Sequence, residues 1–340
     1  PLERHLYQLE NAKGKVSKIR LTNGSGVHSS VMSPTYNYFI NSFSNAEMPL
    51  MVQVFGTDKK GNWITLRTLE ENSLLKQRIK EFGLAKKEFF DMPTRDGNYM
   101  LSGYYFKPAN FDPKKKYPAL IFQYSGPGSQ NVLNSWGGSN YYWHQMLAQK
   151  GYLVAVIDTR GTGGRGRDFK HLTYGQLGKL ESEDLIDAGK FIGRTSFVDP
   201  TRIGIWGWSF GGYMSTLSFF LGNDVYKMAI AVAPVTSWRF YDTIYTERYL
   251  KRPQDNPKGY DEYSPLLHAD KFKKGNYLLI HGTGDDNVHF QNAVVLQNEL
   301  IKLGKHFDMF YYPDKDHGIN GGNTRMHLYR LMTNYVLQKL

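Results

Sequence analysis

Apolar and polar positions alternate in short runs over the first 70 residues, which is the period of half-buried β-strands. Turn-forming stretches rich in glycine, asparagine and lysine separate the runs. The expected strands are residues 5–10, 16–21, 29–34, 36–43, 49–56 and 63–70. The last four predict one antiparallel meander, which is too small a sheet to be stable alone. The pattern favours the final blade of a β-propeller after the end of another blade; the alternative is a small sheet packed on a second domain.

The period changes after a polar, helix-like join at residues 71–82. Apolar strands are expected at residues 99–106, 117–124, 152–158, 202–207, 228–234, 276–282 and 307–312. Amphipathic helices are expected at residues 140–150, 182–192, 212–222, 290–304 and 325–340. This alternation predicts an α/β fold with a mostly parallel sheet and helices on both faces. We therefore expect a partial β-propeller over residues 1–84 and an α/β domain over residues 85–340.

A serine flanked by glycines stands between the strand at 202–207 and the following helix. The stretch Gly207-Trp208-Ser209-Phe210-Gly211 fits G-x-S-x-G, the nucleophile elbow of α/β-hydrolases. So tight a turn strains the serine backbone and leaves no room for bulk beside it, which accounts for the glycines. The pattern predicts that Ser209 lies at a helix N-terminus, where the backbone N–H of Phe210 faces developing negative charge.

A serine nucleophile needs a base and a residue that orients the base, and in this fold they follow in the order Ser, Asp, His. Asp285 and Asp286 follow the strand at 276–282, and His317 follows the last strand. Spacing does not choose between the two aspartates, and either could cap the next helix instead. His281 precedes both aspartates, which is the wrong order for the base, so we interpret it as a packed or hydrogen-bonded residue.

A glycine motif at residues 161–166 literally fits G-x-G-x-x-G, the dinucleotide-binding pattern. That pattern also requires an acidic residue about 20 positions on, at the end of a second strand. Glu181 and Asp184 are at about that distance, but they lie in or beside the expected helix and no strand intervenes. We therefore predict a flexible glycine loop near the site, with no NAD or FAD.

Three aromatic residues, Trp238, Tyr241 and Tyr245, fall at i, i+3 and i+7, which predicts one face of a helix. Core packing would explain this stripe. Its position at the carboxyl ends of the strands would equally suit an aromatic box for a rigid apolar ring such as proline. The two interpretations stay open on the residues alone.

Composition removes several classes of site. The chain has 340 residues and no cysteine, which excludes disulfides, thiol catalysis and cysteine-ligated metals. The formal net charge of +11 raises nucleic acid as a partner, but the lysines form short loop-like groups without an arginine-rich helix, so we expect no nucleic-acid partner. We also expect no membrane contact, because no apolar run approaches the roughly 18 to 20 residues of a spanning helix. The first ten residues lack the apolar core of a signal peptide.

Four segments together resemble the prolyl oligopeptidase family of serine peptidases, and most closely its dipeptidyl peptidase IV group with its bacterial members. The segments are "GWSFGGY" at 207–213, "AVAPVTSWRFYDTIYTERY" at 231–249, "LLIHGTGDDNVHFQN" at 278–292 and "DKDHGI" at 314–319. The resemblance implies that Ser209 is the nucleophile, His317 the general base and Asp285 the acid that orients the base. No metal or organic cofactor is implied.

The resemblance also implies a substrate site. Tyr124 matches the tyrosine whose hydroxyl completes an oxyanion hole with a backbone N–H, here that of Phe210. Asn287 matches a residue that bonds a substrate carbonyl. The implied proline pocket consists of Val235, Trp238, Tyr241, Tyr245 and Val288. Phe210 stands where the family usually has tyrosine, which removes a hydroxyl from the pocket wall and leaves the N–H in place.

The implied activity is that of a serine exopeptidase. It would release Xaa-Pro or Xaa-Ala dipeptides from peptides with proline or alanine second from the amino terminus. A homodimer and a periplasmic, secreted or cell-surface location are implied as well. The family's glutamate pair for the substrate amino group would lie in propeller segments outside this sequence, so a prolyl tripeptidyl peptidase or an esterase stays open. The alternative of another class is a non-catalytic scaffold, against which the presence of Ser209, Asp285 and His317 argues.

Overall fold

The computed structural model describes residues 1–12 and 14–340. Contacts divide the chain into two compact units. One unit contains Pro1–Lys87 and Val132–Gln145, and the other contains Glu88–Asn131 and Met146–Leu340. The backbone therefore changes unit at three points, 87/88, 131/132 and 145/146.

The N-terminal unit contains two antiparallel sheets and a short helix. A hairpin pairs β1 (Tyr7–Ala12) with β2 (Lys15–Arg20). The second sheet has the order β3-β4-β5-β6, with the bounds Val27–Met32, Tyr38–Ser44, Met51–Thr57 and Trp63–Glu70. This sheet confirms the predicted meander. Helix α1 (Ser73–Glu81) follows it.

Strand β4 shows why this sheet forms. Phe39, Asn41 and Phe43 are buried along it in alternation with more exposed residues, as the period of two requires. The Phe39 ring stacks on Phe55 of β5 with centroids 4.8 Å apart. The buried amide of Asn41 bonds the Nδ1 of His28 on β3 at 3.1 Å.

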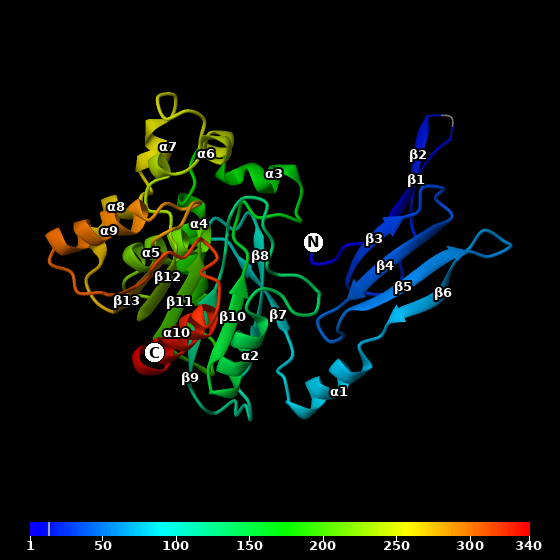
Figure 1. The fold of residues 1–340 in the computed structure, drawn as a ribbon, viewed down its shortest axis with the longest axis horizontal. Helices are drawn as coiled ribbons and strands as arrows, with labels where there is room; N and C mark the ends of the chain where they lie inside the picture. The colour runs from blue at the N-terminus through cyan, green and yellow to red at the C-terminus, as the bar shows by residue number, and fades with distance from the viewer. Residues whose placement is uncertain (13) are drawn as a thin grey trace. The chain divides into compact units, whose positions relative to one another are not determined.

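The larger unit is built on one eight-stranded sheet with the order β14-β13-β12-β11-β9-β10-β8-β7 (Figure 1). Its strands, from β7 to β14, are Glu88–Pro93, Met100–Phe106, Tyr117–Phe122, Leu153–Ile157, Val198–Trp208, Met228–Val232, Asn276–Gly282 and Asp308–Tyr312. Only the pairs that involve β8 are antiparallel. The prediction of a mostly parallel sheet is confirmed, whereas β7 was not predicted.

Helices cover both faces of this sheet. Helices α4 (Lys179–Gly193) and α5 (Phe210–Leu221) pack on each other and on β11 (Figure 1). Ile203 and Ile205 of β11 belong to the core on that side. Gly204 points to the other face, where a Cβ would meet Leu340 at 3.0 Å, directly after α10 (Thr324–Lys339).

Six further helices in the described part of the chain vary in length from four to twelve residues. They are α2 (Tyr141–Gln149), α3 (Arg167–Lys170), α6 (Thr243–Leu250), α7 (Pro257–Asp261), α8 (Pro265–His268) and α9 (Gln291–Lys302). Single 3₁₀ turns occupy His171–Thr173, Trp238–Phe240 and Ala269–Lys271. Because β9, β11, β12, β13 and β14 run parallel, the loops after them share one edge of the sheet, where α/β proteins carry their sites.

Candidate active site

Ser209 occupies the turn between β11 and α5 in a strained backbone conformation. Its φ is 60° and its ψ is −120°, which non-glycine residues rarely adopt. Its N–H donates to the carbonyl of Val232 at 2.8 Å, and its carbonyl accepts from the N–H of Tyr213 at 2.9 Å. These bonds from a neighbouring strand and from the helix hold the turn against its strain.

The glycines around Ser209 are required by backbone approaches. A Cβ on Gly211 would lie 2.6 Å from the carbonyl oxygen of Gln123, and one on Gly207 would lie 2.8 Å from the same atom. Real Cβ atoms do not approach backbone so closely. The elbow therefore packs against the end of β9, and the glycine pattern that the sequence displays has a packing cause.

His317 and Asp285 meet across the loops that follow β14 and β13. The distance from His317 Nδ1 to Asp285 Oδ2 is 2.8 Å. The other oxygen of Asp285 accepts from the backbone N–H groups of Asn287 at 3.0 Å and Val288 at 2.9 Å. Asp286 is exposed. The contact geometry thus separates two aspartates that spacing left equivalent.

The charge of Asp285 is stabilised by these donors. Burial works to raise the pKa of its carboxyl, but hydrogen bonds from His281 and His317 outweigh burial and hold the pKa well below its usual value. The side chain of Asp285 is fully buried, and that of His317 is 21% exposed. An ionised, buried carboxylate therefore faces one nitrogen of a partly accessible imidazole, which leaves the other nitrogen, Nε2, to exchange a proton.

The loop of His317 is tied to the serine elbow. The indole Nε1 of Trp208 donates to the carbonyl of His317 at 3.1 Å. The guanidinium of Arg325 lies 4.8 Å from the centre of the Trp208 ring and donates to the carbonyl of Gly318 at 2.9 Å. Residues directly beside Ser209 and His317 are thus fixed to each other, although they are more than 100 positions apart in the chain.

Tyr124 follows β9 and reaches Ser209. Burial raises the pKa of its hydroxyl above the usual value and the nearby Ser209 side chain partly offsets this rise, so the hydroxyl stays protonated as a donor at neutral pH. Phe210 is the first residue of α5, and its N–H has no carbonyl partner within the helix. Two donors are therefore available near Ser209.

The aromatic residues do not form the predicted single helix. Trp238 lies in a 3₁₀ turn, Tyr241 is extended, and α6 begins only at Thr243. Asp242 caps α6 by accepting from the N–H of Tyr245 at 2.8 Å, which ends any continuous helix through the stripe. The prediction of one helical face was wrong, although the rings still meet in space.

The rings of Trp238, Tyr241 and Tyr245 lie with centroids 5.4 to 6.1 Å apart in all three pairs. Phe210 joins them with its centroid 5.5 Å from that of Trp238. The hydroxyl of Tyr241 donates to Asn287 Oδ1 at 2.7 Å. An aromatic wall thus leads from Phe210, directly after Ser209, to the loop of Asp285.

Val235 and Val288 are almost completely buried and belong to the core cluster on this side of the sheet. Trp238 is 2% exposed, whereas Tyr241 and Tyr245 are partly exposed. The implied pocket residues therefore form a buried base with two more accessible tyrosines.

The glycine loop at 161–166 serves backbone packing. A Cβ on Gly163 would lie 2.6 Å from the carbonyl oxygen of Gly128. Gly163 donates to the carbonyl of Ser129 at 2.8 Å, and Gly128 donates to that of Gly161 at 3.2 Å. The loop thus pairs with the segment that follows Tyr124.

Two buried polar residues that support the site were not identified from the sequence. Gln123 Nε2 donates to the carbonyl of Gly211 at 2.7 Å and to Ser215 at 3.0 Å. Asn292 accepts from the N–H of Thr236 at 2.9 Å. A polar residue at the end of an otherwise apolar strand was the available signal for Gln123.

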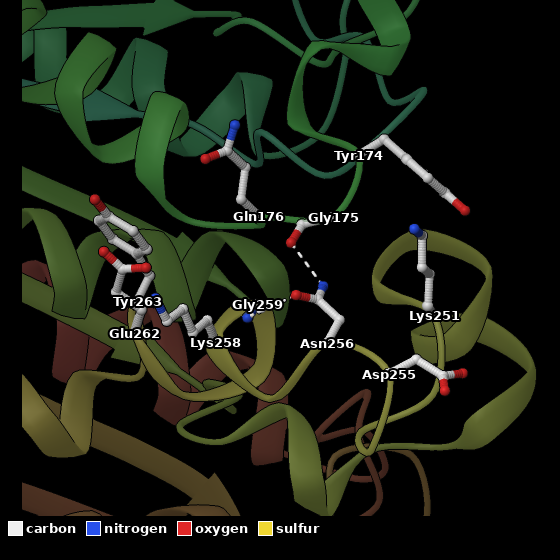
Figure 2. Close-up of a pocket in the computed structure, with 10 residues that line it drawn as sticks. All are labelled: Tyr174, Gly175, Gln176, Lys251, Asp255, Asn256, Lys258, Gly259, Glu262 and Tyr263. Carbon is white, nitrogen blue, oxygen red and sulfur yellow. Dashed lines mark hydrogen bonds between the residues drawn. The ribbon is translucent and has the colours of Figure 1, made fainter.

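A cavity of about 330 Å³ lies elsewhere in the larger unit, between the loop after α3 and the loop between α6 and α7 (Figure 2). Its lining contains both charge signs, with Lys251, Lys258, Asp255 and Glu262. The amide of Asn256 donates across it to the carbonyl of Gly175 at 2.8 Å (Figure 2). None of the predicted site residues lines this cavity.

The sequence profile of the prolyl oligopeptidase family matches residues 139–340, which is more than half of the chain. The chain belongs to the prolyl oligopeptidase family. Accordingly, the larger unit has the α/β-hydrolase fold of that family, and the antiparallel sheets before it are consistent with part of a β-propeller.

Several relatives in this family have names. The probable dipeptidyl-aminopeptidase B of Aspergillus terreus is 35% identical over 99% of this chain and 36% of the relative. Dipeptidyl peptidase 4 of Felis catus is 39% identical over 80% of this chain and 35% of the relative. The crystal structure of Porphyromonas gingivalis dipeptidyl peptidase 4 is similar with a TM-score of 0.93 and 43% identity, over 100% of this chain and 47% of that one. The chain thus spans about a third of the length of these curated relatives and about half of the solved structure.

Within residues 1–12 and 14–340, no group of three or more histidine, aspartate or glutamate side chains is placed to hold a metal ion. No helix in the same described ranges has the length and apolar character needed to cross a membrane.

Proposed function

We propose that this chain carries the catalytic site of a serine exopeptidase that releases Xaa-Pro or Xaa-Ala dipeptides from peptide amino termini. The single observation that carries the proposal is the 2.8 Å contact between Asp285 and His317, tied through Trp208 to a strained serine at a strand-to-helix turn. The names of the relatives support the dipeptidyl peptidase activity.

In the proposed reaction, Ser209 Oγ attacks the carbonyl carbon after the second residue of the peptide while its proton passes to His317 Nε2. His317 then gives the proton to the leaving amine as the C–N bond breaks, which forms an acyl-enzyme. Water repeats the sequence and releases the dipeptide. Asp285 holds the imidazole with Nδ1 protonated, and its buried charge stabilises the imidazolium in both steps.

The Tyr124 hydroxyl and the Phe210 N–H would donate to the oxyanion of the tetrahedral intermediate. Both donors are fixed before the reaction, one by burial of its ring and the other by the start of α5. The negative charge would also face the positive end of the α5 dipole.

The aromatic wall formed by Phe210, Trp238, Tyr241 and Tyr245 would receive the proline or alanine side chain, with Val235 and Val288 behind it. A rigid apolar ring suits such a surface because it loses little conformational entropy on binding. Asn287 would bond a substrate carbonyl through its amide N–H₂, because its Oδ1 accepts from Tyr241.

We further propose a domain boundary at 84/85, a homodimeric assembly and a periplasmic, secreted or cell-surface location. The boundary rests on the change of hydrophobic period after residues 71–82, and the other two rest on the family resemblance. Size-exclusion chromatography with light scattering and fractionation of the source cells test the last two.

A fluorophosphonate probe tests the nucleophile, because it needs an assembled serine site and no peptide-binding segments. We expect stoichiometric labelling by intact-mass spectrometry, lost in Ser209→Ala. Ser218→Ala is the matched control, since it removes a buried hydroxyl from the same helix away from the turn. Absence of labelling in a folded chain, or labelling that persists in Ser209→Ala, would contradict the proposal.

Substrate selection is tested separately with chromogenic amides of Xaa-Pro, Xaa-Ala and Xaa-Xaa-Pro, with free and acetylated amino termini, and with a simple ester. The chain alone and a version with a complete propeller are compared. Preference for the unblocked Xaa-Pro amide supports dipeptide release. Preference for the tripeptide or the ester would replace it.

A further inference from the structure

His281, at the end of β13, lies with one ring nitrogen between two oxygen atoms of the proposed site. Its Nε2 is 2.7 Å from the carbonyl oxygen of Val288 and 3.2 Å from Asp285 Oδ2. The side chains of His281 and Asp285 are both completely buried. The interpretation of His281 as a hydrogen-bonded residue is confirmed, and one of its two partners is the carboxylate of Asp285.

The chemistry of these partners fixes the proton position on His281. A carbonyl oxygen and an ionised carboxylate only accept hydrogen bonds, so Nε2 must carry the proton and donate to both. The other nitrogen, Nδ1, is buried and has no hydrogen-bond partner among the described residues. A proton there would leave a buried N–H without an acceptor, which is costly. The neutral ring of His281 therefore carries its proton on Nε2.

This donor completes the coordination of Asp285. Oδ2 receives His281 and His317, while Oδ1 receives the backbone N–H groups of Asn287 and Val288. Two donors on each oxygen fix the carboxylate plane. Without His281, Oδ2 would have His317 as its only remaining side-chain donor, and rotation of the carboxylate would be resisted from one side only.

We propose that His281 is a positioning residue that holds the carboxylate of Asp285 toward His317. The same N–H also donates to the carbonyl of Val288, and it thereby holds the loop 285–288 beside the aromatic pocket. The proposal rests on the proposed function, since it assigns His281 a part in that site. His281 itself does not exchange protons with substrate, because its Nε2 is occupied and the ring is buried.

The titratable groups that face Asp285 come from three segments. They are His281 from β13, His317 from the loop after β14 and Tyr241 from the segment before α6. Burial raises the pKa of Tyr241 to about 12, so this hydroxyl stays neutral over the range tested below. A change in the pH profile on substitution of His281 therefore reports on the Asp285–His317 pair.

Two substitutions separate the hydrogen bond from the packing. His281→Phe keeps a ring beside Phe290, whose centroid is 5.8 Å away, and removes the donor. His281→Gln keeps an N–H donor. His268→Phe is the matched control, because His268 Nε2 also contacts a backbone carbonyl, that of Glu262 at 2.8 Å, away from the site.

The rate of fluorophosphonate labelling is measured from pH 5 to 9. In His281→Phe we expect the plateau rate to fall about ten-fold, as loss of a bond to a charged group predicts. We also expect the acid limb to move to higher pH, because a carboxylate with one donor fewer favours protonated His317. His281→Gln should return the limb toward that of the parent chain. A parent-like rate and limb in His281→Phe would overturn the proposal.

A measurement on the unmodified chain needs neither activity nor a stable variant. Nuclear magnetic resonance of ¹⁵N-histidine, assigned with His281→Gln, should find the neutral ring of His281 protonated on Nε2. A neutral ring with its proton on Nδ1 would overturn the proposal. If the folded parent chain does not label at all, the proposed function fails, and the proton position still decides whether His281 donates to Asp285.

Discussion

The Tyr124→Phe substitution isolates one donor near Ser209. It removes the hydroxyl beside Ser209 and keeps the ring. That ring is confined, because its centroid is 6.1 Å from that of Phe210 and a Cβ on Gly126 would come within 2.6 Å of its edge. Phenylalanine therefore fits without repacking.

The structure predicts unequal effects on stability and rate. A single partly buried hydroxyl is lost, so the free energy of unfolding should fall by no more than about 1 kcal/mol, the typical value of one hydrogen bond. Two proposed oxyanion donors become one, because the N–H of Phe210 is backbone and persists. Removal of one such donor typically lowers the rate by about 100- to 1000-fold.

The assay is the second-order rate of fluorophosphonate labelling, with urea unfolding measured on the same samples. Tyr311→Phe is the control, because it removes a hydroxyl that donates to Gln297 at 2.8 Å and lies in β14. We expect a large loss of rate in Tyr124→Phe only. A rate within a few-fold of the parent, with the expected small loss of stability, would refute the assignment of Tyr124 to the oxyanion.

Two further predictions concern buried ionisable side chains in the larger unit. Arg160 donates to Asp184 through Nε at 3.0 Å and through Nη2 at 2.6 Å, and both side chains are at most 4% exposed. Arg160→Met leaves the buried carboxylate without its charged partner, so the free energy of unfolding, measured in urea, should fall by about 3 to 5 kcal/mol. The double variant with Asp184→Leu should recover much of this, and a cost for Arg160→Met below about 1 kcal/mol would contradict the burial argument. Burial raises the pKa of Glu181 from 4.5 to about 8, so the folded state keeps a proton that the unfolded chain releases, and the free energy of unfolding should decline as pH rises through this window. Glu181→Gln should remove that decline when urea midpoints at pH 5 and pH 8 are compared, and an equal decline in both proteins would show that Glu181 is not its source.

Strands and the serine turn were predictable because their causes are local. Residues 276–282 form β13 with the predicted bounds, since the short apolar run at 277–280, bounded by glycine-containing turns, favours a buried strand. Strand β7 was missed, because it is an edge strand that ends at Pro93 and has little buried surface. The prediction of one helix through Trp238, Tyr241 and Tyr245 was wrong for a similarly local reason. It followed the spacing of the aromatic residues and overlooked Asp242, which caps the start of α6.

The partners within the site were not predictable by the same route. Asp285 and Asp286 have the same chemistry and adjacent positions, and only the approach of His317 from another strand separates them. His281 carries no local signal for its two bonds, which depend on how the loop after β13 folds back on the strand. Such contacts arise from tertiary folding, which the period of apolar positions does not encode.

The three changes of unit along the backbone have a consequence for how the protein can be divided. A protease that cuts once, near residue 87, would release neither unit intact, because residues 132–145 belong to the first unit and are joined to the second at both ends. An expression fragment that begins at Glu88 would likewise carry this excursion without its partners, including the Ala85 N–H that bonds Gln145 at 2.8 Å. The hydrolase unit is thus an interrupted stretch of sequence, and replacing residues 132–145 with a linker would also remove the first five residues of α2.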